Sequence, residues 1–201
     1  GSVTDIDGNT YQTVSYGDVE WMTENLRTTT FSDGTPISQI CQCDNGGLCF
    51  CSQPGWCNYN QDISYNTQFG KLYTGYTIAS NSNVCPTGWH VSDSNDWDMI
   101  TDLFVTNGVG TNGYGSTSSG SVSSLLLSQT NESYLSLQLG GYNNGCGGGA
   151  NMGDDGTYWT TDPSVTNGNA AANINDNNSP YYIYIGYASI YNYKSIRCVK
   201  D

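Results

Sequence analysis

The alternation of apolar and polar residues predicts β-strands at both ends of the chain. Val3–Val14 alternates around a central Asp-Gly-Asn turn signal, a pattern typical of a β-hairpin. Val19–Leu26 follows, with Trp21 and Leu26 as candidate core residues. Tyr181–Val199 interleaves tyrosine with β-branched residues, which favours strands over a helix.

The middle of the chain carries one helical pattern. Ser92 or Asp93 can cap a helix, and Asp96 lies near the first-turn amides, where a negative charge is favourable. Apolar residues then recur at helical spacing along one face, namely Trp97, Ile100, Leu103 and Phe104. We therefore expect a helix that packs this face against the core.

Four shorter segments give less regular patterns. Phe69–Ala79 mixes aromatic and β-branched residues and predicts a short strand or the entry to a helix near the core. Val122–Leu127 predicts a second short helix or strand, and Leu135–Leu139 alternates as a strand does. Asp33–Pro36 is a turn signal.

The composition favours loops and short strands. The chain has 201 residues, enough for one domain with a sizeable core, and only 11% of them are charged. Gly, Ser, Thr, Asn and Tyr are abundant instead, which disfavours long helices. The Gly-rich sequence after Gly140 is compatible with a linker, but Trp159 and the strand pattern beyond it favour ordered loops. We predict one α+β domain over residues 3–201, with Gly1-Ser2 as a cloning scar.

The charge balance limits the possible partners. The formal net charge is -13 and the chain has five Lys and Arg residues, so phosphates would be repelled and nucleic acid is excluded as a partner. No apolar run is long enough to span a membrane, so we expect no membrane insertion by this chain. We also expect a monomer without a cofactor.

The cysteine spacing leaves two structures open. Cys41 and Cys51 are equidistant from Gly46 in the sequence, and so are Cys43 and Cys49. In an antiparallel hairpin that turns there, each pair would face across one side of the ribbon, within disulfide reach. The same four sulfurs could hold Zn²⁺ tetrahedrally in a reducing compartment. We favour disulfides, because eight cysteines in a chain of 21.7 kDa are typical of an oxidising compartment.

Two other patterns that could carry chemistry are better explained as structural. His90 is the only histidine, and no nucleophile or carboxylate pair stands beside it in an obvious arrangement, so we expect a core or strand-end residue. Asp5, Asp7 and Asn9 have the spacing that begins a calcium loop, but the glutamate that closes such a loop is absent. We therefore predict no catalytic residue, no enzyme activity and no metal site.

The C-terminal segment is unusually rich in tyrosine. Residues 181–193 contain six tyrosines, interleaved with Ile, Gly, Ala, Ser and Asn. Tyrosine offers a large, rigid contact area at low entropic cost, and small polar residues adapt their hydrogen bonds, as in antibody paratopes. A tyrosine-rich edge strand that merely faces water is the alternative. We favour a recognition surface.

A series of motifs, in order, resembles the Fibrobacter succinogenes major paralogous domain over nearly all of residues 3–201. The motifs are VTDIDGNTYQTV, WMTENLR, FSDGTPI, FGKLYTGYT, CPTGWHVSDSNDW, LGGY, YWTTD and SIRCVKD. That family is related to the formylglycine-generating-enzyme subgroup of the C-type lectin fold. The resemblance implies two helices, short strands, much irregular loop, and N- and C-terminal strands close together.

The resemblance also bears on the cysteines. It implies that Cys85 and Cys198 pair, because the two motifs carry them, and elimination then leaves Cys57 to pair with Cys146. Residues 38–58 and Cys146 are additions to the usual pattern, so we treat 38–58 as a Cys-rich insertion.

The segment after LGGY is similar to the variable proteins of diversity-generating retroelements. Its residues are those produced when the adenines of an Asn codon are substituted. Such proteins use a C-type lectin scaffold whose C-terminal ligand site is rewritten by adenine-directed mutagenesis. The resemblance implies that residues 142–193 are variable and bind a ligand, while SIRCVKD is fixed scaffold.

The predicted contact residues are the polar and tyrosine positions of that region, expected to point to solvent from a scaffold held by Trp89, Trp97 and Trp159. They are Asn143, Asn144, Asp154, Asp155, Tyr158, Asn173, Asn175, Asn177, Tyr181, Tyr182, Tyr184, Tyr187, Ser189, Tyr191 and Tyr193.

We therefore expect a display protein, extracellular, on a cell surface or exposed on a virion, that recognises a protein or glycan receptor on another cell. Two alternatives belong to the same fold. An oxidase of the formylglycine-generating type needs a poised cysteine pair, and the only cysteine outside the Cys41–Cys57 cluster, Cys85 and Cys198 is Cys146, in a Gly-rich loop. A calcium-dependent lectin needs Glu-Pro-Asn or Gln-Pro-Asp triplets, which are absent.

Overall fold

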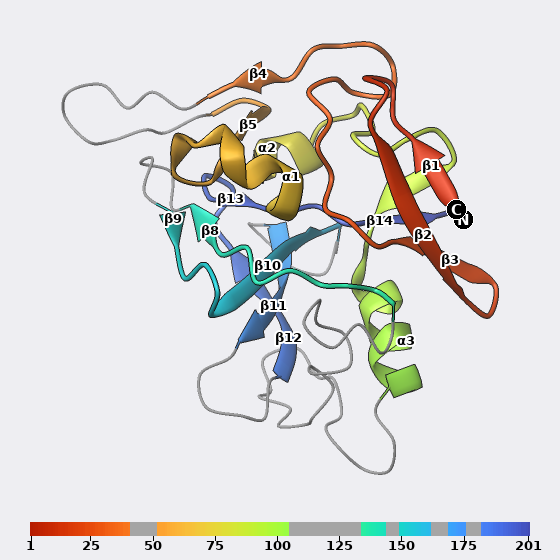
Figure 1. Ribbon diagram of the computed structural model, residues 1–201. Helices are drawn as coiled ribbons and strands as arrows, with labels where there is room; N and C mark the ends of the chain where they lie inside the picture. Colours follow the sequence, from red (N-terminus) through yellow and green to blue (C-terminus); the bar gives the residue numbers. More distant parts are fainter. Residues whose placement is uncertain (41–51, 105–133, 144–148, 162–168, 176–181) are drawn as a thin grey trace.

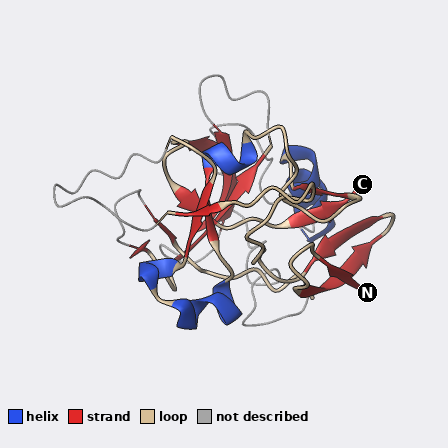
Figure 2. Ribbon diagram, turned by 90° about the horizontal axis from the view of Figure 1, so that it is seen from above, coloured by secondary structure: helices blue, strands red, loops and turns tan. Residues whose placement is uncertain are grey.

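The computed structural model describes residues 1–40, 52–104, 134–143, 149–161, 169–175 and 182–201. These residues form an α+β fold that is mainly β, with three sheets and short helices (Figures 1 and 2). The expected α+β class is therefore confirmed. The predicted cysteine hairpin and the predicted element at Val122–Leu127 lie outside the described residues.

A five-stranded antiparallel sheet joins the two ends of the chain. Its order is β1 (Ser2–Thr4), β2 (Thr10–Tyr16), β3 (Val19–Met22), β14 (Cys198–Lys200) and β7 (Trp89–Val91). The predicted hairpin is confirmed, since Ser2 pairs with Gln12 and Thr4 with Thr10. The N- and C-terminal strands β1 and β14 belong to this one sheet, with β2 and β3 between them, so the two ends of the chain lie in the same part of the molecule, as the resemblance implied.

The second sheet consists of six very short strands. Its order is β4 (Ser38–Gln39), β5 (Gly55–Cys57), β6 (Leu72–Thr74), β13 (Tyr193–Lys194), β8 (Tyr142–Asn143) and β9 (Gly149–Ala150). All its pairs are antiparallel except β4 with β5.

The third sheet carries most of the tyrosine-rich region. It consists of the antiparallel strands β10 (Asp155–Thr160), β11 (Asn169–Asn175) and β12 (Tyr182–Ala188), with β11 in the middle. Isolated parallel bridges, Gly141 to Gly156 and Tyr158 to Ser195, connect β10 to the segments around β8 and β13. The strands predicted within Tyr181–Val199 are thus present as β12, β13 and β14.

Among the described residues, one helix is longer than a single α-turn. α3 (Ser94–Phe104) has eleven residues, whereas α1 (Asn66–Phe69) and α2 (Gly75–Ile78) have four each, and η1 (Tyr59–Gln61) and η2 (Ile63–Tyr65) are single 3₁₀ turns. The resemblance had implied two helices, so the third is a small difference. The predicted strand or helix entry within Phe69–Ala79 appears as β6 followed by α2.

The start of α3 has the predicted cap. The Asp93 carboxylate accepts hydrogen bonds from the backbone N–H groups of Asn95 and Asp96 at 2.8 and 3.0 Å. Trp97 and Ile100 are buried, as expected. Leu103 is 52% exposed, so its predicted place on the buried face is wrong.

Leu135–Leu139 forms no strand, contrary to the alternating pattern. Its leucines are nevertheless buried, and the backbone at Ser136 has a left-handed conformation with φ 52°, which interrupts the extended run that a strand needs. Two of its backbone carbonyls, on Leu135 and Ser136, accept hydrogen bonds from the buried guanidinium of Arg197 at 2.8 and 3.3 Å. Arginine therefore takes the place of a neighbouring strand as the donor to this backbone.

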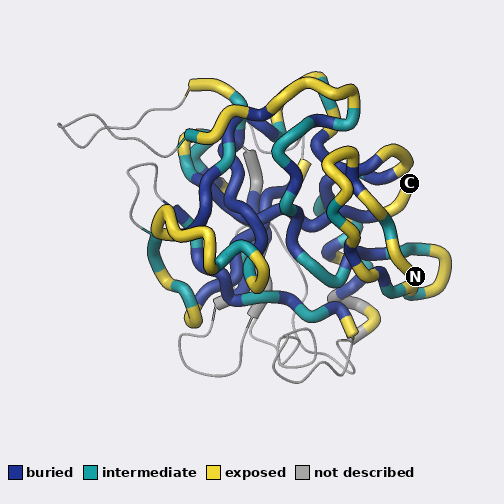
Figure 3. Tube along the Cα trace, turned by 45° about the horizontal axis from the view of Figure 1, so that its top comes forward, coloured by how far each residue is buried: buried dark blue, intermediate teal, exposed yellow. Residues whose placement is uncertain are grey.

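Two large clusters form the core. One contains Trp89 and Trp159 together with Ala171 of β11, and the other contains Trp97 together with Trp21. The rings of Trp21 and Trp97 pack edge to face with centroids 5.2 Å apart. In Figure 3 the buried residues run through the middle of the molecule, while exposed residues lie mostly along its outer turns.

The predicted Cys85–Cys198 disulfide is present, with Cα atoms 6.0 Å apart. Both cysteines are fully buried. The partner predicted for Cys57, Cys146, lies outside the described residues. Cys57 itself is buried, and its sulfur accepts a hydrogen bond from the Asn143 amide at 3.9 Å.

Candidate ligand-binding surface

The register of the third sheet places several predicted contact positions together. Asp155 pairs with Asn175 and Thr157 with Asn173 across β10 and β11, while β12 pairs in turn with β11. Paired residues of neighbouring strands share a face, and side chains alternate along each strand. In the backbone register of this sheet, Asp155 is thus aligned with Asn175 and Tyr182, and Asn173 with Tyr184.

Tyr158 and Tyr193 do not point to solvent, contrary to prediction. Tyr158 is fully buried, its ring centroid lies 5.6 Å from that of Trp97, and its hydroxyl donates to the Gln138 carbonyl at 2.7 Å. Tyr193 is buried in a small cluster with Leu72. Both tyrosines are core residues, because helix α3 and strand β6 cover them.

Asn143 and Asp155 are also buried, which the sequence did not indicate. Asn143 lies on β8 beside Tyr193 and reaches the sulfur of Cys57. One oxygen of Asp155 accepts a hydrogen bond from the Asn151 amide at 2.6 Å, and the other has no hydrogen-bond partner among the described residues. These polar side chains act within the scaffold.

The remaining candidates divide into three groups. Asp154 is exposed, while Asn173 and Ser189 are half-buried. The amide of Asn173 donates to the Ala171 carbonyl at 2.9 Å in its own strand. Asn144, Asn177 and Tyr181 lie outside the described residues.

Two predicted tyrosines are exposed. Tyr187, near the end of β12, exposes 67% of its surface and Tyr191, in the following turn, exposes 37%. That turn is closed by a hydrogen bond from the Asn192 N–H to the Ser189 carbonyl at 2.9 Å. Rings presented from a strand end and a closed turn are held in place without being covered.

A third tyrosine, which sequence reasoning missed, packs against one of these two. Tyr76 of α2 packs edge to face against Tyr191, with ring centroids 5.8 Å apart. Hydrogen bonding to Tyr191 raises the pKa of the Tyr76 hydroxyl. The backbone supports this pair, because the Gly75 N–H donates to the Ile190 carbonyl at 2.9 Å. We call Tyr76, Tyr187 and Tyr191 the tyrosine surface.

A buried cation lies in the strand that follows the turn. Lys194 is only 5% exposed, and its ammonium lies 4.9 Å from the ring centroid of Tyr142 and 5.8 Å from that of Trp159. Burial lowers the pKa of Lys194 to about 8, against the attraction of Asp155. The indole N–H of Trp159 donates to the Tyr73 carbonyl at 2.7 Å, which fixes the ring.

His90 is the middle residue of β7 and is half-buried, so it is neither a core nor a strand-end residue, contrary to prediction. It lies in β7, and its ring nitrogens contact two carboxylates, Nδ1 with Asp201 at 2.8 Å and Nε2 with Asp96 at 3.1 Å. These contacts tie β7 to the first turn of α3 and to the last residue of the chain.

The N-terminal aspartates are used as structural acceptors. Asp5 accepts hydrogen bonds from the backbone and amide N–H groups of Asn9 and from the Tyr11 hydroxyl. Asp7 accepts from Thr28 and Thr29. Across the described residues, no three His, Cys, Asp or Glu side chains are grouped as metal ligands. Of the helices that the structure describes, none is long and apolar enough to cross a membrane.

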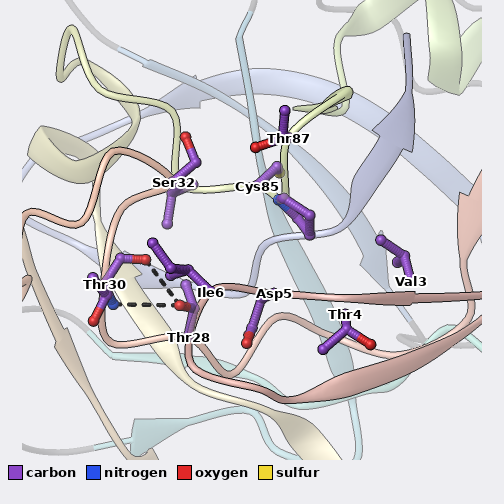
Figure 4. Close-up of a pocket in the computed structure, with 11 residues that line it drawn as sticks. Val3, Thr4, Asp5, Ile6, Thr28, Thr30, Ser32, Cys85 and Thr87 are labelled. Carbon is purple, nitrogen blue, oxygen red and sulfur yellow. Dashed lines mark hydrogen bonds between the residues drawn. The ribbon is translucent and has the colours of Figure 1, made fainter.

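A pocket of about 260 Å³ lies elsewhere, between the first hairpin and the segment around Cys85 (Figure 4). Small side chains line it, many of them hydroxyl-bearing, and none of the predicted contact residues is among them. The Thr28 hydroxyl is already bonded to the Thr30 carbonyl at 2.9 Å. The Asp5 carboxylate at its wall is committed to Asn9 and Tyr11. The tyrosine surface is therefore the better candidate.

Comparison with known proteins adds one match. The family described as the Fibrobacter succinogenes major domain matches residues 14–200. No curated protein and no solved structure matches the chain.

Proposed function

Since the chain belongs to the Fibrobacter succinogenes major domain family, we propose that it is a binding protein with a C-type-lectin-like fold that recognises its partner through the tyrosine surface. The proposed partner is a protein or glycan receptor on another cell. The proposed location is extracellular, on a cell surface or on a virion.

The observation that carries this proposal is the contrast between neighbouring residues around the end of β12. Tyr187 and Tyr191 are exposed, whereas Ala188 and Tyr193 are buried. Aromatic rings that remain exposed beside a packed core are typical of interaction sites, where Tyr is enriched. The exposed rings can therefore contact a partner, while the buried residues between them hold the scaffold.

Separation of scaffold and surface would also permit diversification. The residues of SIRCVKD are deeply buried up to Val199, and Arg197 alone links four backbone or amide oxygens of distant segments, including those of Asn25 and Met22. Substitutions at exposed positions of 142–193 would leave this framework intact. We propose that a retroelement rewrites those positions.

The same geometry favours binding over catalysis. The histidine is engaged by two carboxylates, and Cys85 and Cys198 are joined in a disulfide. An oxidase of the formylglycine-generating type is the alternative, and its activity would have to depend on Cys146. Oxidation of a cysteine-containing peptide that disappears in Cys146→Ala would support that alternative.

Sequencing sibling copies of the same locus tests the proposal. We expect substitutions at adenine positions of codons within 142–193 and a constant sequence over 3–141 and 194–201. Variation spread evenly along the chain, or its absence from 142–193, would contradict diversification. The codons of Gln12 and Ser15, exposed residues of β2, are the matched control, because exposure alone would let them vary as well.

A further inference from the structure

Every Lys and Arg side chain of this protein already contacts another group within the protein. The chain has five Lys and Arg residues, and all lie within the described part. Arg27 pairs with Glu24 at 2.6 Å and Lys200 with Glu20 at 2.9 Å. Lys71 is buried, with its ammonium 4.5 Å from the ring centroid of Trp56.

The other two are buried more deeply. Arg197 is fully buried among backbone carbonyls, and Lys194 lies over Tyr142. The single histidine is held between Asp96 and Asp201. The surface therefore presents carboxylates and tyrosines with almost no cation left to pair with an acidic partner.

The region around the tyrosine surface likewise carries acidic residues and lacks basic ones. Residues 142–193 contain four aspartates and no Lys, Arg or His. Asp154 of this region is exposed. With a net charge of -13, the protein repels anionic glycans, anionic lipids and nucleic acids and attracts basic surfaces.

The exposed rings supply short-range recognition to match this long-range attraction. The face of an aromatic ring attracts cations, and a guanidinium also stacks on it. In the edge-to-face pair of Tyr76 and Tyr191, the ring that offers its edge keeps both faces clear of the other ring. The protein uses the same contact internally, where the Arg27 guanidinium lies 4.6 Å from the ring centroid of Tyr11.

We propose that the tyrosine surface of this protein binds arginine side chains on a basic protein partner. The inference rests on the proposed function and adds the chemical class of the partner. Arginine is favoured over lysine because its weakly hydrated, planar head can stack on Tyr187 and Tyr191.

The test uses three synthetic peptides of repeated Gly-X-Ser sequence, with Arg, Lys or Glu at X, titrated calorimetrically against the intact protein. We expect the Arg peptide to bind more tightly than the Lys peptide and the Glu peptide not to bind. In the double variant Tyr187→Ser/Tyr191→Ser, binding of the Arg peptide should weaken about tenfold, since two exposed cation–π contacts are lost. The ratio of the affinities for the Arg and Lys peptides should also decrease in this variant.

Tyr134→Ser is the matched control, because Tyr134 is 66% exposed and is not one of the three tyrosines of that surface. Both variants keep the net charge, so simple charge attraction predicts no change in either. Equal Arg and Lys affinities, or an equal effect of the control and the double variant, would overturn the inference. If sibling copies vary as proposed while the peptides are not discriminated, the partner class is wrong and the proposed function stands.

Discussion

The Nδ1 atom of His90 lies 2.8 Å from a side-chain oxygen of Asp201, so strand β7 holds the last residue of the chain. The opposite ring nitrogen lies 3.1 Å from Asp96, at the start of α3. The hydrogen bond to Asp96, reinforced by Asp201 and opposed by partial burial, raises the pKa of His90 to about 9. At neutral pH a charged imidazole therefore links three elements.

This link makes stability depend on pH. Because the folded-state pKa of His90 lies above the ordinary value of 6.5, its contribution is complete below that value and is lost as the pH rises through about 9. We expect His90→Gln to lower the free energy of unfolding near pH 6 and to have little effect near pH 10, measured by urea denaturation. An equal loss at both pH values would show that packing, and not charge, is responsible.

Lys194 should act in the opposite direction. Burial lowers its folded-state pKa to about 8, below the ordinary value of 10.5. The buried charge therefore reduces stability below pH 8, and the reduction fades as the pH rises towards 10.5. We expect Lys194→Met to raise the free energy of unfolding at pH 7 by up to roughly 3 kcal/mol, with a smaller gain near pH 10.

The control for that variant is Lys200→Met, which removes an exposed lysine paired with Glu20. An exposed ion pair contributes about 0–1 kcal/mol, so this change should be small at every pH. Destabilisation by Lys194→Met at pH 7 would mean that contacts of the ammonium with Tyr142 and Trp159 outweigh its desolvation.

Surface and core tyrosines should differ sharply on substitution. Tyr187→Ser/Tyr191→Ser should change the free energy of unfolding by about 1 kcal/mol or less, because exposed side chains contribute little. Trp89→Ala should cost roughly 3 to 5 kcal/mol, and Tyr158→Ser should also be strongly destabilising, because both remove buried rings. Thermal unfolding of all three variants checks this, and a large loss in the double variant would place its rings in the core.

The sequence was informative where local pattern decides the outcome. The N-terminal hairpin follows from its turn residues, and the cap of α3 follows from Asp93. Trp21, Leu26 and Trp97 are buried as large apolar side chains should be. In each case the relevant partners are near in sequence or the burial follows from side-chain chemistry alone.

Local pattern could not separate the core tyrosines from the exposed ones. Tyr158 and Tyr187 share one face of the third sheet, since Tyr158 pairs with Ala172 and Tyr187 with Ala170. Tyr158 is buried because Trp97 of α3 packs on it, whereas Tyr187, near the end of β12, is 67% exposed. Burial by a helix that is distant in the sequence cannot be predicted from the residues next to either tyrosine.

The contact of Tyr76 with Tyr191 could not be predicted from the sequence for the same reason. It lies in a four-residue helix far along the chain from Tyr191, and only the fold brings the two rings within 5.8 Å. Its neighbours Thr74 and Thr77 are buried and hydrogen-bonded to each other, so the residues of this helix do not indicate a binding role. A pair formed across such a separation requires the structure.

The Cys85–Cys198 disulfide gives the last prediction. It joins residues 113 positions apart and anchors β14, the central partner of β3 and β7. Closing so long a loop restricts the unfolded chain, and removing such a link costs about 2 to 5 kcal/mol. Cys85→Ala/Cys198→Ala should therefore lower the free energy of unfolding by that amount without changing the fold. Because both sulfurs are buried, a mild reductant should leave the native wild type oxidised and reduce it only under unfolding conditions. Equal stability of the variant and the wild type, measured with the remaining cysteines in the same redox state, would show that the packing of Trp89 and Val199 is sufficient to hold the two ends of the chain together.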